Sequence, residues 1–426
     1  MLSTFRHTVN RTSREFLREW RREISKTSTA PNSDAISRQQ KTELNLSQNP
    51  PNKWMRLNKH NNNRALSTIQ TKAKPQSTNY TLVTKDESRE FMAVFPDIVR
   101  DLTDAGRQTD IPEVTKRYAK LLHYNVPNGK KNRGLAVVAA YKMLEKEENL
   151  TPENIRLANI MGWCVEVLQA FFVVTDDFMD RSETRRGLPC WYKKEEIGLS
   201  AVNDAIILEQ GIYTLLKRHF SNHPCLVPTL ELFHDVTLKT AMGQALDCMC
   251  QKDGKPNLDL FTMKKYNSIV KYKTAYYTFQ LPVALAMYMA NLYDPEMHRQ
   301  AKTILLEIGQ FFQIQDDFLD CFGDPEVTGK GGNDIREGKC SWLAVVALQR
   351  ANPAQRKIME EFYGRPGPEA ARVIRNLYQE LSLPNTYAIY EEESFNIIRT
   401  HIQQSSKGLP HKLFFKIMER IYKRDC

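Results

Sequence analysis

Residues 171–180 read Phe171-Phe172-Val173-Val174-Thr175-Asp176-Asp177-Phe178-Met179-Asp180, an apolar run that ends in an acidic cluster. A second copy of this arrangement is Phe311-Phe312-Gln313-Ile314-Gln315-Asp316-Asp317-Phe318-Leu319-Asp320. On a helix, residues four apart lie on one face, so the first and last aspartates of each copy present two carboxylates to one spot. Each copy is therefore predicted to be a helix that carries a pair of hard oxygen ligands.

The two acidic clusters are expected to bind cations together. Two such faces aimed at one cavity would repel each other unless cations lay between them, and oxygen ligands select Mg²⁺, Mn²⁺ or Ca²⁺ over zinc or copper. Mg²⁺ keeps several waters and is usually completed by substrate phosphates, which predicts a diphosphate clamped between the two helices. A solvated acidic face is the alternative, but the aromatic, apolar residues before each cluster are typical of a buried helix.

The net charge of +10 belongs to the first 80 residues. The whole chain has 60 Lys and Arg against 50 Asp and Glu, whereas residues 1–80 alone have 15 against 5. The remainder is balanced, which argues against nucleic-acid binding by a catalytic domain at 81–426. Residues 1–80 are rich in Ser, Thr, Asn and Gln, and the stretch 44–85 has no acidic residue. This composition is typical of a mitochondrial transit region; the alternative is a merely disordered basic leader and a cytoplasmic protein.

Beyond this leader the pattern predicts an all-α domain, a bundle of ten or more helices around a central active-site cavity. Apolar residues recur at helical spacing, and no strand-like alternation with two-residue turns is evident. The clear breaks are at 125–129, 222–224, 252–256 and 323–325, and Pro282 is expected to start or kink a helix. No apolar run approaches the ~18–20 residues of a membrane span. The eight cysteines form no CxxC pair, which indicates reduced thiols.

Several separated blocks resemble the trans-isoprenyl diphosphate synthases, and closely the farnesyl diphosphate synthases of animals. The blocks follow the family's order from about Phe91 onward: NGKKNRG (128–134), DDFMDRSETRRG (176–187), CWY (190–192), GQ (243–244) with Asp247, KYKT (271–274), GQFFQIQDDFLD (309–320), TGK (328–330) and KCSW (339–342). The resemblance implies the family's helical fold and a homodimer. It also implies a prenyltransferase that condenses isopentenyl diphosphate with dimethylallyl and geranyl diphosphate to give farnesyl diphosphate.

The resemblance also assigns roles to individual residues. It implies that Mg²⁺, or Mn²⁺, is held by Asp176, Asp180 and Asp316. The allylic diphosphate is then gripped by cationic side chains, namely Arg185, Lys273, Lys330 and Lys339. The nascent cation is stabilised by polar groups, namely the Lys273 carbonyl, Thr274 and Gln313. Isopentenyl diphosphate has its own metal-free site, formed by Gly129, Lys130, Arg133, Gln169 and Arg186.

Phe171 and Phe172 are expected to limit the length of the product. They precede Asp176 by five and four residues, which places their rings about one helical turn (5.4 Å) deeper than the metal site. A growing hydrocarbon chain would end there, at fifteen carbons. The alternative is that both rings belong to the ordinary apolar core.

Two other functions remain open from the sequence. A terpene synthase of this fold would ionise a prenyl diphosphate without a co-substrate, and it would not need Lys130, Arg133 and Arg186, which are all present. A non-catalytic partner subunit of a heteromeric synthase would tolerate damage to the acidic motifs, and both motifs are intact. The sequence therefore favours the chain-elongating enzyme.

Overall fold

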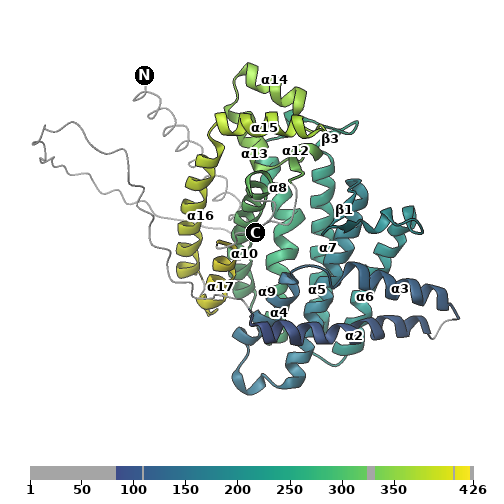
Figure 1. Cartoon of the computed structure of the whole chain (residues 1–426). Coiled ribbons are helices and arrows are strands. Elements are labelled where there is room, and N and C mark those ends of the chain that lie inside the picture. The colour runs from purple at the N-terminus through teal and green to yellow at the C-terminus, as the bar shows by residue number, and fades with distance from the viewer. Residues whose placement is uncertain (1–82, 108–109, 324–331, 406–407, 423–426) are drawn as a thin grey trace, which may run out of the picture. The chain divides into compact units, whose positions relative to one another are not determined.

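The structure is a computed structural model that describes residues 83–422, with gaps at 108–109, 324–331 and 406–407. The leader at 1–80 lies outside the described residues, so its assignment stays a prediction. In the described residues the chain is almost entirely helical, as expected (Figure 1).

The helices of the first half are α2 (Lys85–Arg107), α3 (Pro112–Asn125), α4 (Asn132–Leu144), α5 (Pro152–Met179), α6 (Ala201–Phe220) and α7 (Leu226–Cys248). Those of the centre are α8 (Met263–Ile269), the π-helix η5 (Val270–Gln280), α9 (Leu281–Met289) and α10 (Pro295–Phe322). Those of the last part are α12 (Asp334–Glu337), α13 (Trp342–Arg350), α14 (Pro353–Phe362), α15 (Pro368–Glu380), α16 (Leu383–Ser405) and α17 (His411–Tyr422). Short 3₁₀ turns are η1 (Glu147–Asn149), η2 (Trp191–Lys193), η3 (Gly198–Ser200) and η4 (Leu258–Leu260).

The two helices that carry the acidic motifs, α5 and α10, begin in the same way. Thr151 and Asp294 are their N-caps, and each side chain accepts a hydrogen bond from a backbone N–H in the first turn. A proline follows each cap, where its fixed φ favours the helix and its missing N–H costs nothing. Each helix has 28 residues and ends at its acidic motif.

The packing of the central helices is set by close contacts to η5. Helix α5 packs against α4 and α6, while η5 packs against α7 and α10. Gly243 makes the α7–η5 contact possible, because a Cβ at this position would lie 2.2 Å from the backbone nitrogen of Lys273. Helices α16 and α17 lie beside α10 (Figure 1). At the end of η5, Pro282 occupies the first turn of α9, as predicted.

Two small hairpins, which the sequence analysis did not predict, interrupt the helices. Strands β1 (Thr184–Arg185) and β2 (Leu188–Pro189) form one small antiparallel pair, and β3 (Gln251–Lys252) and β4 (Lys255–Pro256) form another. The central residues of both turns have positive φ, as in type I′ hairpins. The strands are too short for apolar alternation to reveal them.

Helix α5 also corrects the expectation about membrane spans. It is the one helix in the described part of the chain that is long and apolar enough, by length and composition, to cross a membrane. Most of its apolar window, 72%, is buried inside the protein, which is typical of a core helix. The seven cysteines of the described residues are free thiols.

Candidate active site

The carboxylates and cations named in the sequence analysis gather where several helices end. Asp176 and Asp180 lie at the carboxyl end of α5, and Asp247 lies at the carboxyl end of α7. Lys273 comes from η5, and Lys339 comes from the loop between α12 and α13. Carboxyl ends of helices carry partial negative charge, so this position adds to the attraction for cations.

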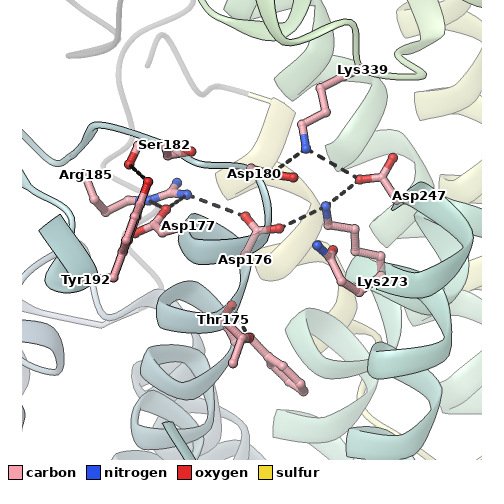
Figure 2. Close-up of polar contacts among 12 residues, drawn as sticks. Thr175, Asp176, Asp177, Asp180, Ser182, Arg185, Tyr192, Asp247, Lys273 and Lys339 are labelled. Atoms are coloured by element: carbon pink, nitrogen blue, oxygen red, sulfur yellow. Dashed lines mark hydrogen bonds and ion pairs between the residues drawn. The ribbon is translucent and has the colours of Figure 1, made fainter. Parts of the chain in front are cut away.

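A chain of ion pairs connects these residues (Figure 2). The Nζ atom of Lys273 lies 2.6 Å from Asp247 Oδ2 and 3.2 Å from Asp176 Oδ1. Lys339 pairs with Asp180, and its Nζ atom lies 3.8 Å from the same Asp247 oxygen. The two lysines and three carboxylates therefore face one spot, which we call the aspartate–lysine cluster.

The charges of the aspartate–lysine cluster control its protonation. Burial alone would raise the pKa of Asp176, but Lys273, Lys339 and Arg185 outweigh it and hold that pKa below its usual range. Burial and the neighbouring Asp176 raise the pKa of Asp180. Burial alone would lower the pKa of Lys273, but the carboxylates around it raise that pKa. Lys273 therefore stays an ammonium that can meet a phosphate oxygen.

The second aspartate of each motif is turned into the protein. Asp177 is 3% exposed and accepts a 2.8 Å hydrogen bond from Arg185 Nε. Asp317 is 5% exposed and accepts hydrogen bonds from the Tyr266 hydroxyl and the Trp342 backbone N–H, both at 2.7 Å. These two carboxylates hold surrounding groups in place, and the first and last aspartates of each motif are left half-buried.

The second motif borders the same region as the first. Asp320 accepts hydrogen bonds from the backbone N–H groups of Asn333 and Asp334, which fixes the start of α12 beside the end of α10. Burial and the carboxylates of Asp180 and Asp320 raise the pKa of Glu337, whereas Lys339 lowers it, and the net pKa is raised. Both motifs are therefore within electrostatic reach of the segment that carries Lys339.

A second group of cations lies apart from the aspartates. Arg133 Nε donates a 3.1 Å hydrogen bond to Thr278 Oγ1, and one terminal nitrogen donates to the Tyr277 hydroxyl at 3.0 Å. Gly129 has a φ of +126°, and a Cβ there would lie 2.7 Å from the Arg186 guanidinium carbon. The structure thus brings Gly129 and Arg186 together, with Arg133 a few residues along the chain. We call Gly129, Lys130, Arg133 and Arg186 the cation cluster.

The remaining predicted residues occupy several environments. Lys130 is exposed, Thr274 is half-buried, and Gln313 donates a 2.9 Å hydrogen bond to Asp317. The Gln169 side-chain oxygen is buried and has no hydrogen-bond partner within the described residues. Lys330 lies outside the described residues.

Phe171 and Phe172 are half-buried and pack on each other, with ring centroids 5.0 Å apart. Phe172 also meets the edge of Tyr277, the residue that holds Arg133. The two rings therefore lie between α5 and η5 rather than deep in a fully closed core.

The donor set of the aspartate–lysine cluster fits a hard divalent cation. Asp176 Oδ1 is buried and accepts no hydrogen bond of normal geometry within the described residues, although Lys273 lies near it. No three Asp, Glu, His or Cys side chains form a ready cage in the described ranges. Mg²⁺ does not require one, because it is typically bound by one or two carboxylates, waters and substrate phosphates.

Some contributors were not assigned by the sequence. Asp247 was noted only as part of a motif, yet it is the shared acceptor of Lys273 and Lys339. Tyr277 and Thr278 were not named, yet they hold Arg133. A usable signal for Asp247 was its position four residues after Gly243, on the same helix face.

Comparison with known proteins agrees with this geometry. Residues 115–381 match the family model described as polyprenyl synthetase. The farnesyl pyrophosphate synthase of Murgantia histrionica is 53% identical over 80% of this chain and 83% of its own. That of Gallus gallus is 46% identical over 81% of this chain and 94% of its own. A T. brucei farnesyl diphosphate synthase complexed with a bisphosphonate superimposes with a TM-score of 0.74 and 31% identity, over 80% of this chain and all of that one. The chain belongs to the polyprenyl synthetase family.

Proposed function

We propose that this protein condenses isopentenyl diphosphate with dimethylallyl diphosphate, and then with geranyl diphosphate, to form farnesyl diphosphate. The observation that carries the proposal is the presence of two separate cationic sites. The lysines of one are ion-paired with aspartates, whereas Arg133 and Arg186 of the other form no ion pair with them in the described residues. Two sites of different chemistry suit two diphosphates that react differently. Relatives that are 46–53% identical and carry the name farnesyl pyrophosphate synthase support the same product.

The aspartate–lysine cluster is suited to the allylic diphosphate. Asp176, Asp180 and Asp316 would hold Mg²⁺, or Mn²⁺ in its place, and the bound metal would neutralise charge that develops on the leaving diphosphate. Lys273, Lys339 and Arg185 present fixed positive charge beside these carboxylates, and Lys330 is proposed to join them. When the diphosphate binds, we expect each lysine to exchange an aspartate oxygen for a phosphate oxygen.

The carbon chemistry takes place beside Thr274 and Gln313. As the allylic C–O bond breaks, a cation forms, and the Lys273 carbonyl, Thr274 hydroxyl and Gln313 amide stabilise it without capturing it. The double bond of isopentenyl diphosphate attacks this cation, a proton leaves, and the chain is five carbons longer. Phe171 and Phe172 are proposed to stop the chain after the second round.

The cation cluster is suited to isopentenyl diphosphate. Arg133 is held by hydrogen bonds and Arg186 lies against Gly129, and neither forms an ion pair with the aspartates of the first site in the described residues. Arginine matches a diphosphate through several N–H donors in a fixed geometry. The terpene-synthase alternative has no use for this cluster, and no observation here favours it.

The proposal is tested by product analysis. The purified protein is incubated with labelled isopentenyl diphosphate, dimethylallyl diphosphate and Mg²⁺, and the products are separated by chain length after phosphatase treatment. We expect farnesol as the main labelled alcohol. A hydrocarbon or alcohol formed from the allylic substrate alone at full rate would favour the terpene synthase, and no turnover at all would favour a non-catalytic subunit.

We further propose that the protein is a homodimer. Apolar side chains that are half or more exposed recur at helical spacing on α6 and α7, namely Val202, Ile206, Val227, Leu238 and Met242. Scattered exposed apolar residues are normal, but a cluster on two packed helices is typical of an interface. Sedimentation analysis should give a dimer mass, and Ile206→Asp with Met242→Asp should give a monomer. A monomeric native protein would contradict the proposal.

For the leader we propose mitochondrial import, which rests on composition alone. Residues 1–80 fused to a fluorescent reporter should reach mitochondria. The matched control replaces four arginines of the leader, Arg14, Arg18, Arg21 and Arg22, with glutamine and should stay in the cytosol. A diffuse signal from the native leader would contradict this proposal.

A further inference from the structure

Glu166 is a buried carboxylate beneath the cation cluster, and neither the sequence nor the family comparison gives it a role. It lies on α5 and is 5% exposed. Its Oε1 atom accepts a 2.7 Å hydrogen bond from the backbone N–H of Gly134. It precedes Asp176 by ten residues, which corresponds to roughly 15 Å along the helix. Its environment is therefore that of the metal-free site and not of the aspartate–lysine cluster.

The hydrogen bond to Gly134 replaces a missing cap on α4. The N-terminal N–H groups of a helix have no partner inside it, and a side chain at the N-cap normally satisfies one of them. The N-cap of α4 is Lys131, which is left-handed (φ 50°) and makes no side-chain cap hydrogen bond. Glu166 supplies this acceptor from the neighbouring helix, so it fixes the start of α4, where Arg133 is the second residue.

A pair of glycines fixes the position of this carboxylate. A Cβ at Gly134 would lie 2.7 Å from the Gly162 carbonyl oxygen, and a Cβ at Gly162 would lie 2.6 Å from the Gly134 carbonyl oxygen. Helices α4 and α5 therefore touch through their backbones at this point. Glu166 follows Gly162 by one helical turn and has little room to move, which is the condition for holding a neighbour in place.

Glu166 also balances the positive charge of the cluster. Burial raises the pKa of Glu166, whereas the Gly134 N–H and the charges of Arg133, Arg186 and Lys131 lower it, and the net pKa is raised. The Arg186 guanidinium itself lies close to Gly129. Without a carboxylate below them, these cations would repel one another when no substrate is bound, and their side chains would turn toward water.

We propose that Glu166 is a positioning residue for the second substrate: it holds the Gly129–Arg133 segment and Arg186 so that their cations meet one diphosphate. A carboxylate in an anion-binding site opposes the anion by charge, so its benefit must come from geometry. This inference rests on the proposed function, because it assigns isopentenyl diphosphate to the cation cluster.

The test compares Michaelis constants for the two substrates in Glu166→Ala and Glu166→Gln. Removing a hydrogen bond to a charged group should raise KM for isopentenyl diphosphate by roughly tenfold or more in Glu166→Ala. Glutamine keeps the acceptor for Gly134 but loses the charge, so a smaller rise of about threefold is expected in Glu166→Gln. The KM for geranyl diphosphate should stay within about twofold in both variants, because its site is a distant one.

The matched control is Asn159→Ala, which removes another buried polar side chain from α5, two turns earlier. It should lower the melting temperature without raising the KM for isopentenyl diphosphate more than the KM for geranyl diphosphate. An unchanged KM for isopentenyl diphosphate in Glu166→Ala, or equal rises for both substrates, would overturn the inference. Because the native protein is assayed in parallel, failure of the inference alone leaves farnesyl diphosphate production intact, whereas failure of the proposed function removes it.

Discussion

The aspartate–lysine cluster and the cation cluster are each proposed to bind a diphosphate, but they are built in opposite ways. In the first, Lys273 and Lys339 are each paired with carboxylates, and Asp247 is shared between them. In the second, Arg133 is held by the neutral hydroxyls of Tyr277 and Thr278. The lysines of the first site are ion-paired, and its carboxylates are available to a metal. The carboxylate of the second site, Glu166, is buried and accepts a hydrogen bond from a backbone N–H rather than from an arginine.

This difference would allow the two diphosphates of the proposed reaction to be treated differently. The allylic diphosphate must leave, so its site needs charge that a metal can supply as the bond breaks. The diphosphate of the second substrate only anchors the molecule, so fixed arginines are sufficient. The β1–β2 hairpin links the two sites, because Arg185 pairs with Asp177 while the next residue, Arg186, lies against Gly129.

The largest effect is expected from removing a proposed metal ligand, either Asp176 of the aspartate–lysine cluster or Asp316 of the second acidic motif. Asp176→Ala or Asp316→Ala should abolish turnover in saturating Mg²⁺, because the lost leaving-group stabilisation is worth several kcal/mol, roughly a thousandfold in kcat. Steady-state assays measure kcat, and circular dichroism checks the fold. Asp235→Ala, an exposed aspartate paired with Lys239, is the control and should be fully active. Near-normal kcat in either site variant would contradict the metal role.

The next largest effect should differ between the two adjacent arginines of the β1–β2 hairpin, because each is expected to affect the KM of a different substrate. Arg186→Ala, like Lys130→Ala, should raise KM for isopentenyl diphosphate by roughly tenfold to a hundredfold, as expected for a lost charged hydrogen bond. Arg185→Ala should instead raise KM for the allylic substrate. It also leaves Asp177 buried without its partner, so its melting temperature should fall. If both variants shifted both Michaelis constants equally, the separation of the two sites would be wrong.

Replacing either of the two phenylalanines should have a smaller effect on kcat but a clear effect on the chain length of the product. Phe171→Ala or Phe172→Ala should extend the product to twenty carbons or more. Both rings are half-buried, so the loss of stability should be less than the ~3–5 kcal/mol typical of a fully buried ring. Phe220→Ala, a fully buried ring on α6, controls for destabilisation and should leave product length unchanged. If the variants still formed a fifteen-carbon product, residues other than Phe171 and Phe172 would limit the product length.

The smallest effect lies outside both sites, at the contact between α16 and α10. A 2.7 Å hydrogen bond to Glu307 raises the pKa of His401 above 6.5. The stability from this pair is therefore fully present below pH 6.5 and is lost as the pH rises through the raised pKa. His401→Gln should lower the melting temperature more at pH 6 than at pH 8.5. The corresponding loss of unfolding free energy should be less than about 1 kcal/mol, because the pair is partly exposed. An equal difference at both pH values would contradict the pairing.

The helices and the acidic motifs could be predicted from the sequence because each depends on the pattern within one short segment. The spacing of Asp176 and Asp180, and the apolar residues before them, depend only on the period of one helix. The same reasoning missed the β1–β2 and β3–β4 hairpins, whose two-residue strands are too short to show an alternation of apolar and polar residues.

The rest of the site depends on contacts between distant segments, which no local pattern records. Asp247 reaches Lys273 because Gly243 lets α7 touch η5. Glu166 reaches Gly134 because two glycines let α4 touch α5. In each case a glycine inside a helix indicates that another segment packs closely against it, but the sequence alone does not identify that segment.

The measurement that tests the two-site account most directly is the binding of each substrate alone, by isothermal titration calorimetry, in Mg²⁺ and in excess EDTA. We expect isopentenyl diphosphate to bind with nearly the same Kd in both, because the cation cluster meets it without a metal. Dimethylallyl diphosphate should bind at least roughly tenfold more weakly in EDTA, a loss of about 1.4 kcal/mol or more. Equal dependence of both substrates on Mg²⁺, or independence of both, would contradict the account.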